Sequence, residues 1–136
     1  MKNLFLSLFL VASFILINCE SEPVTGSEEV LEIENVQFVV DSTYTFGNDF
    51  KAEGTITNIG NSSITPIWYL EASFFRDQNQ TFKMGGDNTS YSFSLGSGQS
   101  TGWQITFRNN QYPASENPDF SVGEIRVYKN DTNSSN

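Results

Sequence analysis

The chemistry open to this chain is limited first by the side chains that it lacks. It contains no histidine and a single cysteine, Cys19. This composition excludes Ser-His-Asp and Cys-His catalysis, histidine ligands for a metal, an intrachain disulfide and a multi-cysteine zinc site. Two carboxylates about 5–10 Å apart could still hydrolyse a glycosidic bond, but no acidic residue stands in a recognisable catalytic pattern. We therefore expect a protein that is not an enzyme, with a small hydrolase as an alternative.

A bound calcium ion is a second use for the acidic side chains. Asp77, Asn79 and Thr81 present oxygen atoms at alternate positions, and Asp87 lies close in the sequence. Hard cations prefer carboxylate and carbonyl oxygens, so Asp77, Asn79 and Asp87 form a candidate metal site. The complete twelve-residue calcium loop is absent, and Asp and Asn also favour turns because they bond to their own backbone. Both interpretations stay open, and no other cofactor is indicated.

Aromatic side chains on the outer face of a strand are the third candidate. If residues 66–76 form a strand, Tyr69 and Phe75 share its outer face, while Tyr112 lies in a long loop and Tyr128 on the last strand. Aromatic rings flanked by polar side chains can stack on sugars or contact a protein partner. Alternatively, the second sheet, a loop or the N-terminal segment covers them. These four residues are the candidate ligand-binding residues.

The N-terminus has the layout of an export signal. Lys2 precedes an uncharged, mostly apolar stretch over residues 4–17. A short basic region followed by about 7–15 apolar residues is typical of a secretory signal, whereas a membrane span needs about 20. The residues that follow, Leu16-Ile17-Asn18-Cys19, resemble the lipobox of bacterial lipoproteins, although Asn18 stands where that family usually has Gly, Ala or Ser.

The lipobox resemblance implies a division of the chain. Residues 1–18 would be a lipoprotein signal peptide, and Cys19 would carry the covalent lipid that anchors the protein in a membrane. Residues 19–34 would combine this cysteine with an acidic flexible tether, because residues 20–34 contain six glutamates and no basic residue. A β-sandwich domain over residues 35–130 and a disordered tail over residues 131–136 complete the chain.

Short alternating segments separated by turn residues predict an all-β domain beyond the tether. Strands are expected over residues 35–41, 49–57, 66–76, around Phe82 and Met84, and over 91–95, 103–107 and 122–128, with every second residue from Phe50 and from Trp68 facing the core. Turns are expected at residues 58–61, 77–80, 85–88 and 96–98, and a loop at 109–119. About seven short strands at roughly 8–12-residue spacing favour an immunoglobulin-like antiparallel β-sandwich, with a small barrel as the structural alternative.

Four segments follow one another in a suggestive order: GTITNIG (54–60), SITP (63–66), LEASFFRD (70–77) and LGSGQS (95–100). This order resembles the FxLYD-type domains of bacterial surface proteins, over residues 50–107. Phe75-Arg76-Asp77 departs from the compact Tyr-Asp turn of that family. The resemblance implies an accessory β-sandwich on an exported protein and implies no catalytic residue.

These observations lead to an expected function in the bacterial cell envelope. The formal charge of −9 argues against a nucleic-acid partner, because phosphate binding needs clustered Lys and Arg. We expect a lipid-anchored protein of the outer membrane or cell surface, whose sandwich is a binding or envelope-assembly module for an envelope protein or a glycan. The end loops 58–65, 85–90 and 109–119 would carry specificity. A carbohydrate-binding module using Tyr69, Phe75 and Tyr112 is the alternative, and the oligomeric state stays open.

Overall fold

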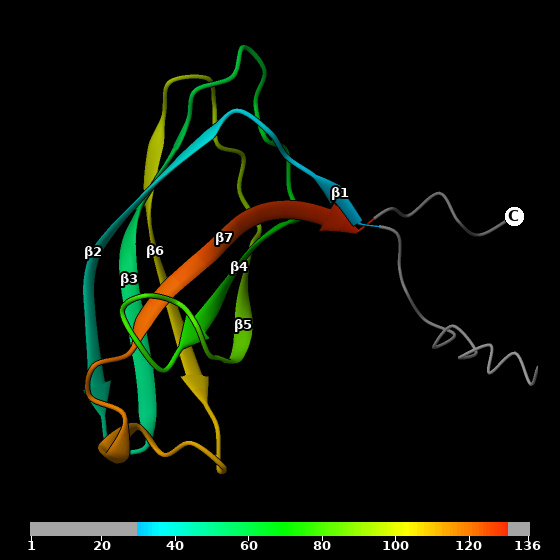
Figure 1. Ribbon diagram of the computed structural model, residues 1–136. Coiled ribbons are helices and arrows are strands. Elements are labelled where there is room, and N and C mark those ends of the chain that lie inside the picture. The colour runs from blue at the N-terminus through cyan, green and yellow to red at the C-terminus, as the bar shows by residue number, and fades with distance from the viewer. Residues whose placement is uncertain (1–29, 131–136) are drawn as a thin grey trace, which may run out of the picture.

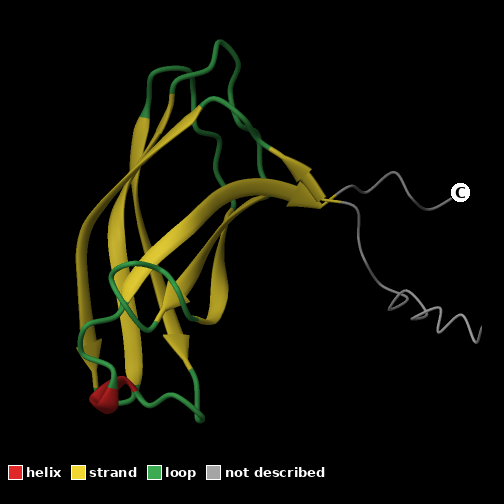
Figure 2. Cartoon of the chain, in the orientation of Figure 1, coloured by secondary structure: helices red, strands yellow, loops and turns green. Residues whose placement is uncertain are grey.

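Two antiparallel sheets pack face to face in the computed structural model, which describes residues 30–130 (Figures 1 and 2). One sheet has the strand order β1-β7-β4-β5, and the other has the order β2-β3-β6. Helical structure within this range is limited to one 3-10 turn, η1 (Ala114–Glu116), drawn red in Figure 2. The strands are β1 (Val30–Glu32), β2 (Val36–Phe46), β3 (Asp49–Asn58), β4 (Trp68–Phe75), β5 (Lys83–Tyr91), β6 (Ser100–Arg108) and β7 (Ser121–Asn130).

The separate sheets confirm the predicted immunoglobulin-like β-sandwich, and the barrel alternative is wrong. Within residues 30–130, no helix is long and apolar enough to cross a lipid bilayer. The predicted signal peptide (1–18), Cys19, residues 20–29 of the predicted tether and the predicted tail (131–136) lie outside the described residues.

Alternating burial along β3 and β4 produces the core. In β3, Phe50, Ala52 and Ile56 are fully buried, while Lys51, Glu53 and Thr55 are half-buried. In β4, the predicted inward residues Trp68 and Leu70 are fully buried in the same way, but Ser73 and Phe75, which were predicted to face outward, are buried as well. A strand with one face on the core and one toward solvent has this period of two, so the predicted inward faces of both strands are confirmed.

Four phenylalanine rings join the two sheets. Phe50 of β3 and Phe107 of β6 come from one sheet, Phe74 of β4 comes from the other, and Phe120 immediately precedes β7. The ring centroids of Phe50 and Phe120 are 4.9 Å apart, and those of Phe74 and Phe107 are 5.0 Å apart. These separations lie in the range in which aromatic pairs attract one another. The cluster therefore fixes the distance between the layers.

The predicted turn at residues 85–88 is wrong, because β5 runs through it in register with β4. Gly85 lies opposite Phe74, and Asp87 lies opposite Ala72. A Cβ atom on Gly85 would come within 2.8 Å of the Phe107 ring. Glycine inside a strand often marks such a close approach, so its role here is to admit the aromatic core.

The predicted strand over residues 91–95 is also wrong. Tyr91 is the last residue of β5, and Leu95 forms an isolated bridge with Ile64, which lies in the loop between β3 and β4. Leu95 is nevertheless buried, because the two loops close this end of the core together. The alternation of Tyr91, Phe93 and Leu95 therefore did not mark a strand, and Phe93 is 44% exposed.

One strand, β1, was not predicted, and another, β2, is longer than predicted. β1 pairs with the edge of β7, so residues 30–32 belong to the sandwich and not to the tether predicted over 19–34. β2 continues to Phe46, although its predicted end was at 41, and its register shifts between Val40 and Ser42. Such a bulge inserts an extra residue, here Asp41, and breaks the alternation from which strands are predicted.

A second bulge lies in β7, where that strand pairs with β4. Two residues of β7, Glu124 and Ile125, lie opposite Ala72 alone, because the register shifts by one residue there. Glu124 has a positive φ of 46°, and its carboxylate accepts a hydrogen bond from the Ser73 hydroxyl (2.8 Å). Ile125 packs against the core and Val127 is fully buried, as predicted.

Asn58 closes the end of the sandwich at which β3 finishes. Its buried side-chain amide donates hydrogen bonds to the carbonyls of Ser62 (2.8 Å) and Leu95 (2.9 Å), and its side-chain oxygen accepts the N–H of Gly60 (3.0 Å). Buried polar atoms are stable only when they are bonded in this way. One side chain thus fastens the loop after β3 to the loop before β6.

We expect Gly54→Ala to destabilise the sandwich. A Cβ atom at this position would overlap the Val39 carbonyl oxygen and lie 2.9 Å from the Trp103 ring. Overpacking of this kind costs about 1–3 kcal/mol, occasionally more, and should lower the midpoint of urea unfolding. Gly102→Ala is the matched control, because its Cβ would lie 3.8 Å from the nearest atom, the Gly54 oxygen. Equal midpoints for the two variants would contradict the close contact at Gly54.

Asn58→Asp should also destabilise the fold, for a different reason. The substitution removes both donors and places a carboxylate beside the carbonyls of Ser62 and Leu95. Leaving buried groups unsatisfied costs about 1–3 kcal/mol, and more for a charged group. Asn61→Asp makes the same chemical change at an exposed position of the same loop. Urea unfolding at pH 7 should separate the two variants, and a similar loss in both would argue against the role of Asn58.

Candidate binding surfaces

The Asp77 turn is held by its own backbone. One carboxylate oxygen of Asp77 accepts the N–H of Asn79 (3.1 Å), and the other accepts the hydroxyl of Thr81 (2.9 Å) and the N–H of Phe82 (3.1 Å). Hydrogen bonds from the backbone, that of Thr81 foremost, hold the pKa of the Asp77 carboxyl below its usual range. This geometry explains why the turn is built from Asp, Asn and Thr without a bound ion.

The three candidate calcium ligands are not brought together. Asp87 lies on β5 opposite Ala72, and Ala72 precedes Asp77 by five residues (77 − 72). At a rise of roughly 3.3 Å per strand residue, Asp87 is far from the Asp77 turn. Within residues 30–130, no three or more acidic, histidine or cysteine side chains are grouped closely enough to hold a metal ion.

Two of the candidate aromatic residues stack on each other on the outer face of the four-stranded sheet. The rings of Tyr69 and Tyr128 are 5.2 Å apart and nearly parallel. Arg126 lies over the Tyr128 ring and donates two hydrogen bonds to Glu71 (2.8 and 3.0 Å). Tyr128 is 8% exposed, and burial raises the pKa of its hydroxyl. The pair is therefore part of a packed side-chain ladder.

The other two candidate aromatic residues lie elsewhere. Phe75 is buried, at 5% exposure, and Tyr112 packs edge-on against the Phe82 ring at 5.3 Å. The expectation that the outer face exposes these rings is thus wrong for Phe75 and for Tyr128, because neighbouring side chains cover both. The four residues do not form one aromatic platform.

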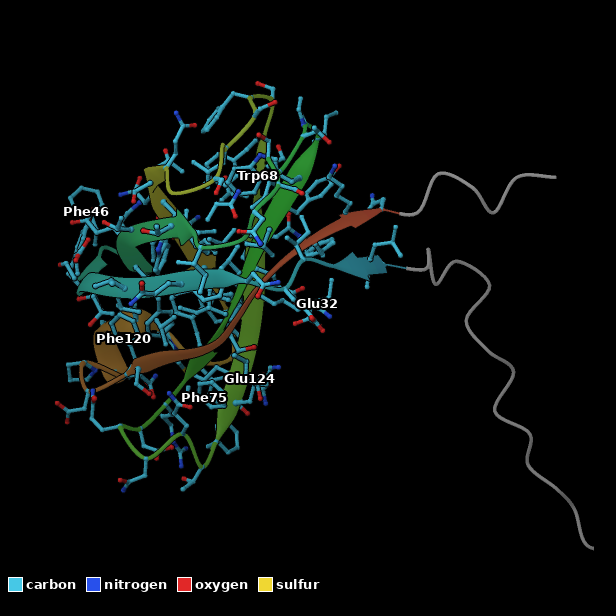
Figure 3. All side chains as sticks on the ribbon, turned by 90° about the horizontal axis from the view of Figure 1, so that it is seen from above. Glu32, Phe46, Trp68, Phe75, Phe120 and Glu124 are labelled. Atoms are coloured by element: carbon cyan, nitrogen blue, oxygen red, sulfur yellow. The ribbon has the colours of Figure 1, made fainter. Side chains whose placement is uncertain are left out.

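β2 carries more of the exposed large apolar side chains than any other strand among the described residues. Nine large hydrophobic residues are exposed within residues 30–130, and four of them lie on this one strand: Val39, Val40, Tyr44 and Phe46. Phe46 is 71% exposed and stands at the far tip of the strand, at the opposite side of the molecule from Glu32 (Figure 3). Tyr44 and Phe46 were missed from the sequence because they follow the bulge at Asp41. The alternation of Tyr44 with Phe46 was the signal that could have identified them.

An open, acidic hollow of about 490 Å³ lies beside β2 on the same sheet. Asp41, Glu53, Gly102 and Gln104 are among the residues that line it. Asp41 accepts a hydrogen bond from the hydroxyl of Thr55 (3.1 Å), and Glu53 accepts one from the amide of Gln104 (3.4 Å). The three ion pairs found in the described part of the chain involve other carboxylates, so Asp41 and Glu53 have no basic partner there.

Comparison with known proteins adds no relative to this picture. No family model matches the chain, and no curated protein matches it. The function is therefore inferred from the residues and from the geometry described above.

The Asp77 turn should make the stability of the protein depend on pH in acid. Because the folded-state pKa of Asp77 is lowered, its contribution to stability is complete above the unfolded pKa of about 3.9 and is lost as the pH falls through the folded-state pKa. Thermal melts should therefore show Asp77→Asn below the wild type at pH 5–7, with the gap closing below about pH 4. Asp119→Asn, at an exposed position, is the control. A gap for Asp77→Asn that stays constant down to pH 2 would contradict this assignment.

Proposed function

We propose that this chain is a lipid-anchored, exported protein of the bacterial cell envelope whose β-sandwich is a non-catalytic binding or assembly module. The export signal and the lipobox-like residues ending at Cys19 support the anchor. The acidic residues between Cys19 and β1 suit a spacer that stays in water. The packed core and the open, shallow form of the hollow beside β2 support binding over catalysis, because active sites are usually enclosed clefts.

The position of the chain ends is the observation on which this proposal chiefly rests. Val30 pairs with Asn130, so both ends of the described chain lie together at one corner of the sandwich. The far end of β2 lies on the opposite side of the molecule (Figure 1), where Phe46 stands across from Glu32 (Figure 3). A tether that enters at the β1–β7 corner would hold that corner toward the membrane and present β2 away from it. Residues 20–29 would allow a reach of up to about 35 Å, at about 3.3–3.6 Å per residue.

The carbohydrate-binding alternative gains no specific support. It depends on Tyr69, Phe75 and Tyr112 acting together, but Phe75 is buried and Tyr112 packs against Phe82. Protein binding through the exposed apolar side chains of β2 is consistent with the general chemistry of interfaces, in which aromatic residues are enriched.

Lipidation at Cys19 can be tested directly in cells. A fatty-acid analogue supplied to the producing bacterium should label the wild-type protein and leave Cys19→Ala unlabelled, because the thiol is the point of attachment. Ser21→Ala, two residues further along, should label like the wild type. Membrane fractionation should show the labelled proteins in the membrane and Cys19→Ala released from it. Labelling of Cys19→Ala at the wild-type level would refute the anchor.

A further inference from the structure

We propose that the free edge of β2 binds an extended, positively charged polypeptide segment of a partner protein, which adds as a fourth strand to the β2-β3-β6 sheet. This inference rests on the proposed binding function and specifies the chemistry of its partner. It does not depend on the lipid anchor.

The backbone of β2 is the first reason. β2 is an edge strand of eleven residues, so alternate N–H and C=O groups along it point away from β3. The other edges are less open: β1 has only three residues, and β5 and β6 contact each other across the two sheets more extensively than β2 contacts β7 and η1. Natural edge strands are often protected by Lys, by Pro or by bulges; β2 has one bulge, at Asp41, and contains neither Lys nor Pro. An extended peptide can hydrogen-bond to such an edge along its length.

The side chains of β2 supply the second reason. Val39, Tyr44 and Phe46 lie opposite Thr55, Lys51 and Asp49, and these partners alternate with the buried residues of β3. The three side chains therefore share the outer face of the sheet, where they are exposed. Every second side chain of an added strand would lie beside this row and cover it.

Charge identifies the kind of segment. Asp41 lies at the bulge of β2 and Glu53 on the adjoining strand, and both line the open hollow of about 490 Å³. Of the cations further along this face, Arg108 pairs with Asp49 (2.6 Å), whereas Lys51 donates to the neutral Thr106 hydroxyl (3.0 Å) and keeps its charge. A lysine or arginine from the added strand would meet two carboxylates without a basic partner among the described residues.

The same charges argue against a second copy of this chain as the occupant. Pairing two β2 strands would bring the Asp41 and Glu53 carboxylates of one copy toward those of the other. The formal charge of −9 on each chain adds to this repulsion. Like charges opposite each other on neighbouring strands are destabilising.

A peptide-binding experiment on the full-length protein in detergent tests the proposal. The probe is a fluorescently labelled peptide in which valine alternates with threonine and lysine, and binding is followed by fluorescence anisotropy. We expect saturable binding that weakens about tenfold or more in the double variant Tyr44→Ala/Phe46→Ala and in Asp41→Asn/Glu53→Gln. The control variant Ile59→Ala/Ile67→Ala removes two apolar side chains that are each 58% exposed and lie outside β2. It should bind the peptide like the wild type.

Two changes to the peptide keep the test independent of variant folding. Replacing the lysines of the peptide by glutamates should abolish binding. Two further peptides are N-methylated at alternate residues, one at the odd and one at the even positions. Only the peptide whose methyl groups lie on the edge that pairs with β2 should lose binding. Equal binding of the acidic peptide would overturn the charge assignment, and equal binding of both methylated peptides would overturn strand addition. Sedimentation could instead show a dimer that the substitution Phe46→Lys dissociates. The edge of β2 would then bind a second copy of this chain, and the proposal would be overturned. If the wild-type protein binds the peptide but is not labelled by the fatty-acid analogue, the anchor alone is refuted. If it is labelled but does not bind the peptide, the edge site alone is refuted.

Discussion

The sandwich depends above all on the contact between the rings of Phe50, Phe74, Phe107 and Phe120. Antibody-type domains add a disulfide between their sheets, but this chain has a single cysteine, Cys19, and cannot form a disulfide within itself. Each of the four rings is at most 7% exposed. Burying such a side chain contributes about 1.5–3 kcal/mol, and the ring-to-ring contacts add to this. Aromatic packing therefore does here what a covalent link does in the antibody domains.

A core of large rings requires places where the backbone can come close. Gly54 lies under the Trp103 ring, and Gly85 lies against Phe107. The pairing of large with small residues across the layers gives the dense packing seen in protein interiors. Asn58 completes this arrangement at the end of the sandwich, where loop backbone replaces side chains as the filling and must be hydrogen-bonded.

The sequence predicted the parts of this fold that follow a period of two. The inward faces of β3 and β4 were correct because each strand has one face on the core. The bulges in β2 and β7 break this period and were not predicted, because the residues that form them, Asp41 and Glu124, are ordinary surface types. Gly85 was misread because glycine serves both turns and close contacts, and only the position of the Phe107 ring distinguishes the two.

The candidate sites were harder to predict for a related reason. Parity along a strand correctly placed Tyr69 and Tyr128 on an outer face, but it does not indicate which side chains cover that face. The oxygen-rich Asp77 turn has the same composition whether its carboxylate binds an ion or the backbone. Both questions depend on neighbours that are distant in the sequence.

The bulge in β2 gives an exposed apolar edge a protection against pairing with identical edges. An open strand edge with exposed Tyr44 and Phe46 favours pairing with other copies, which natural sheets avoid through bulges and charges at their edges. Here the bulge places Asp41 on the edge itself, and the Thr55 hydroxyl bonds to its carboxylate. The acidic group repels an identical edge and attracts a basic one. A single insertion into the strand can therefore both prevent self-association and select the partner, which accounts for an apolar edge that is guarded by a carboxylate and not by lysine or proline.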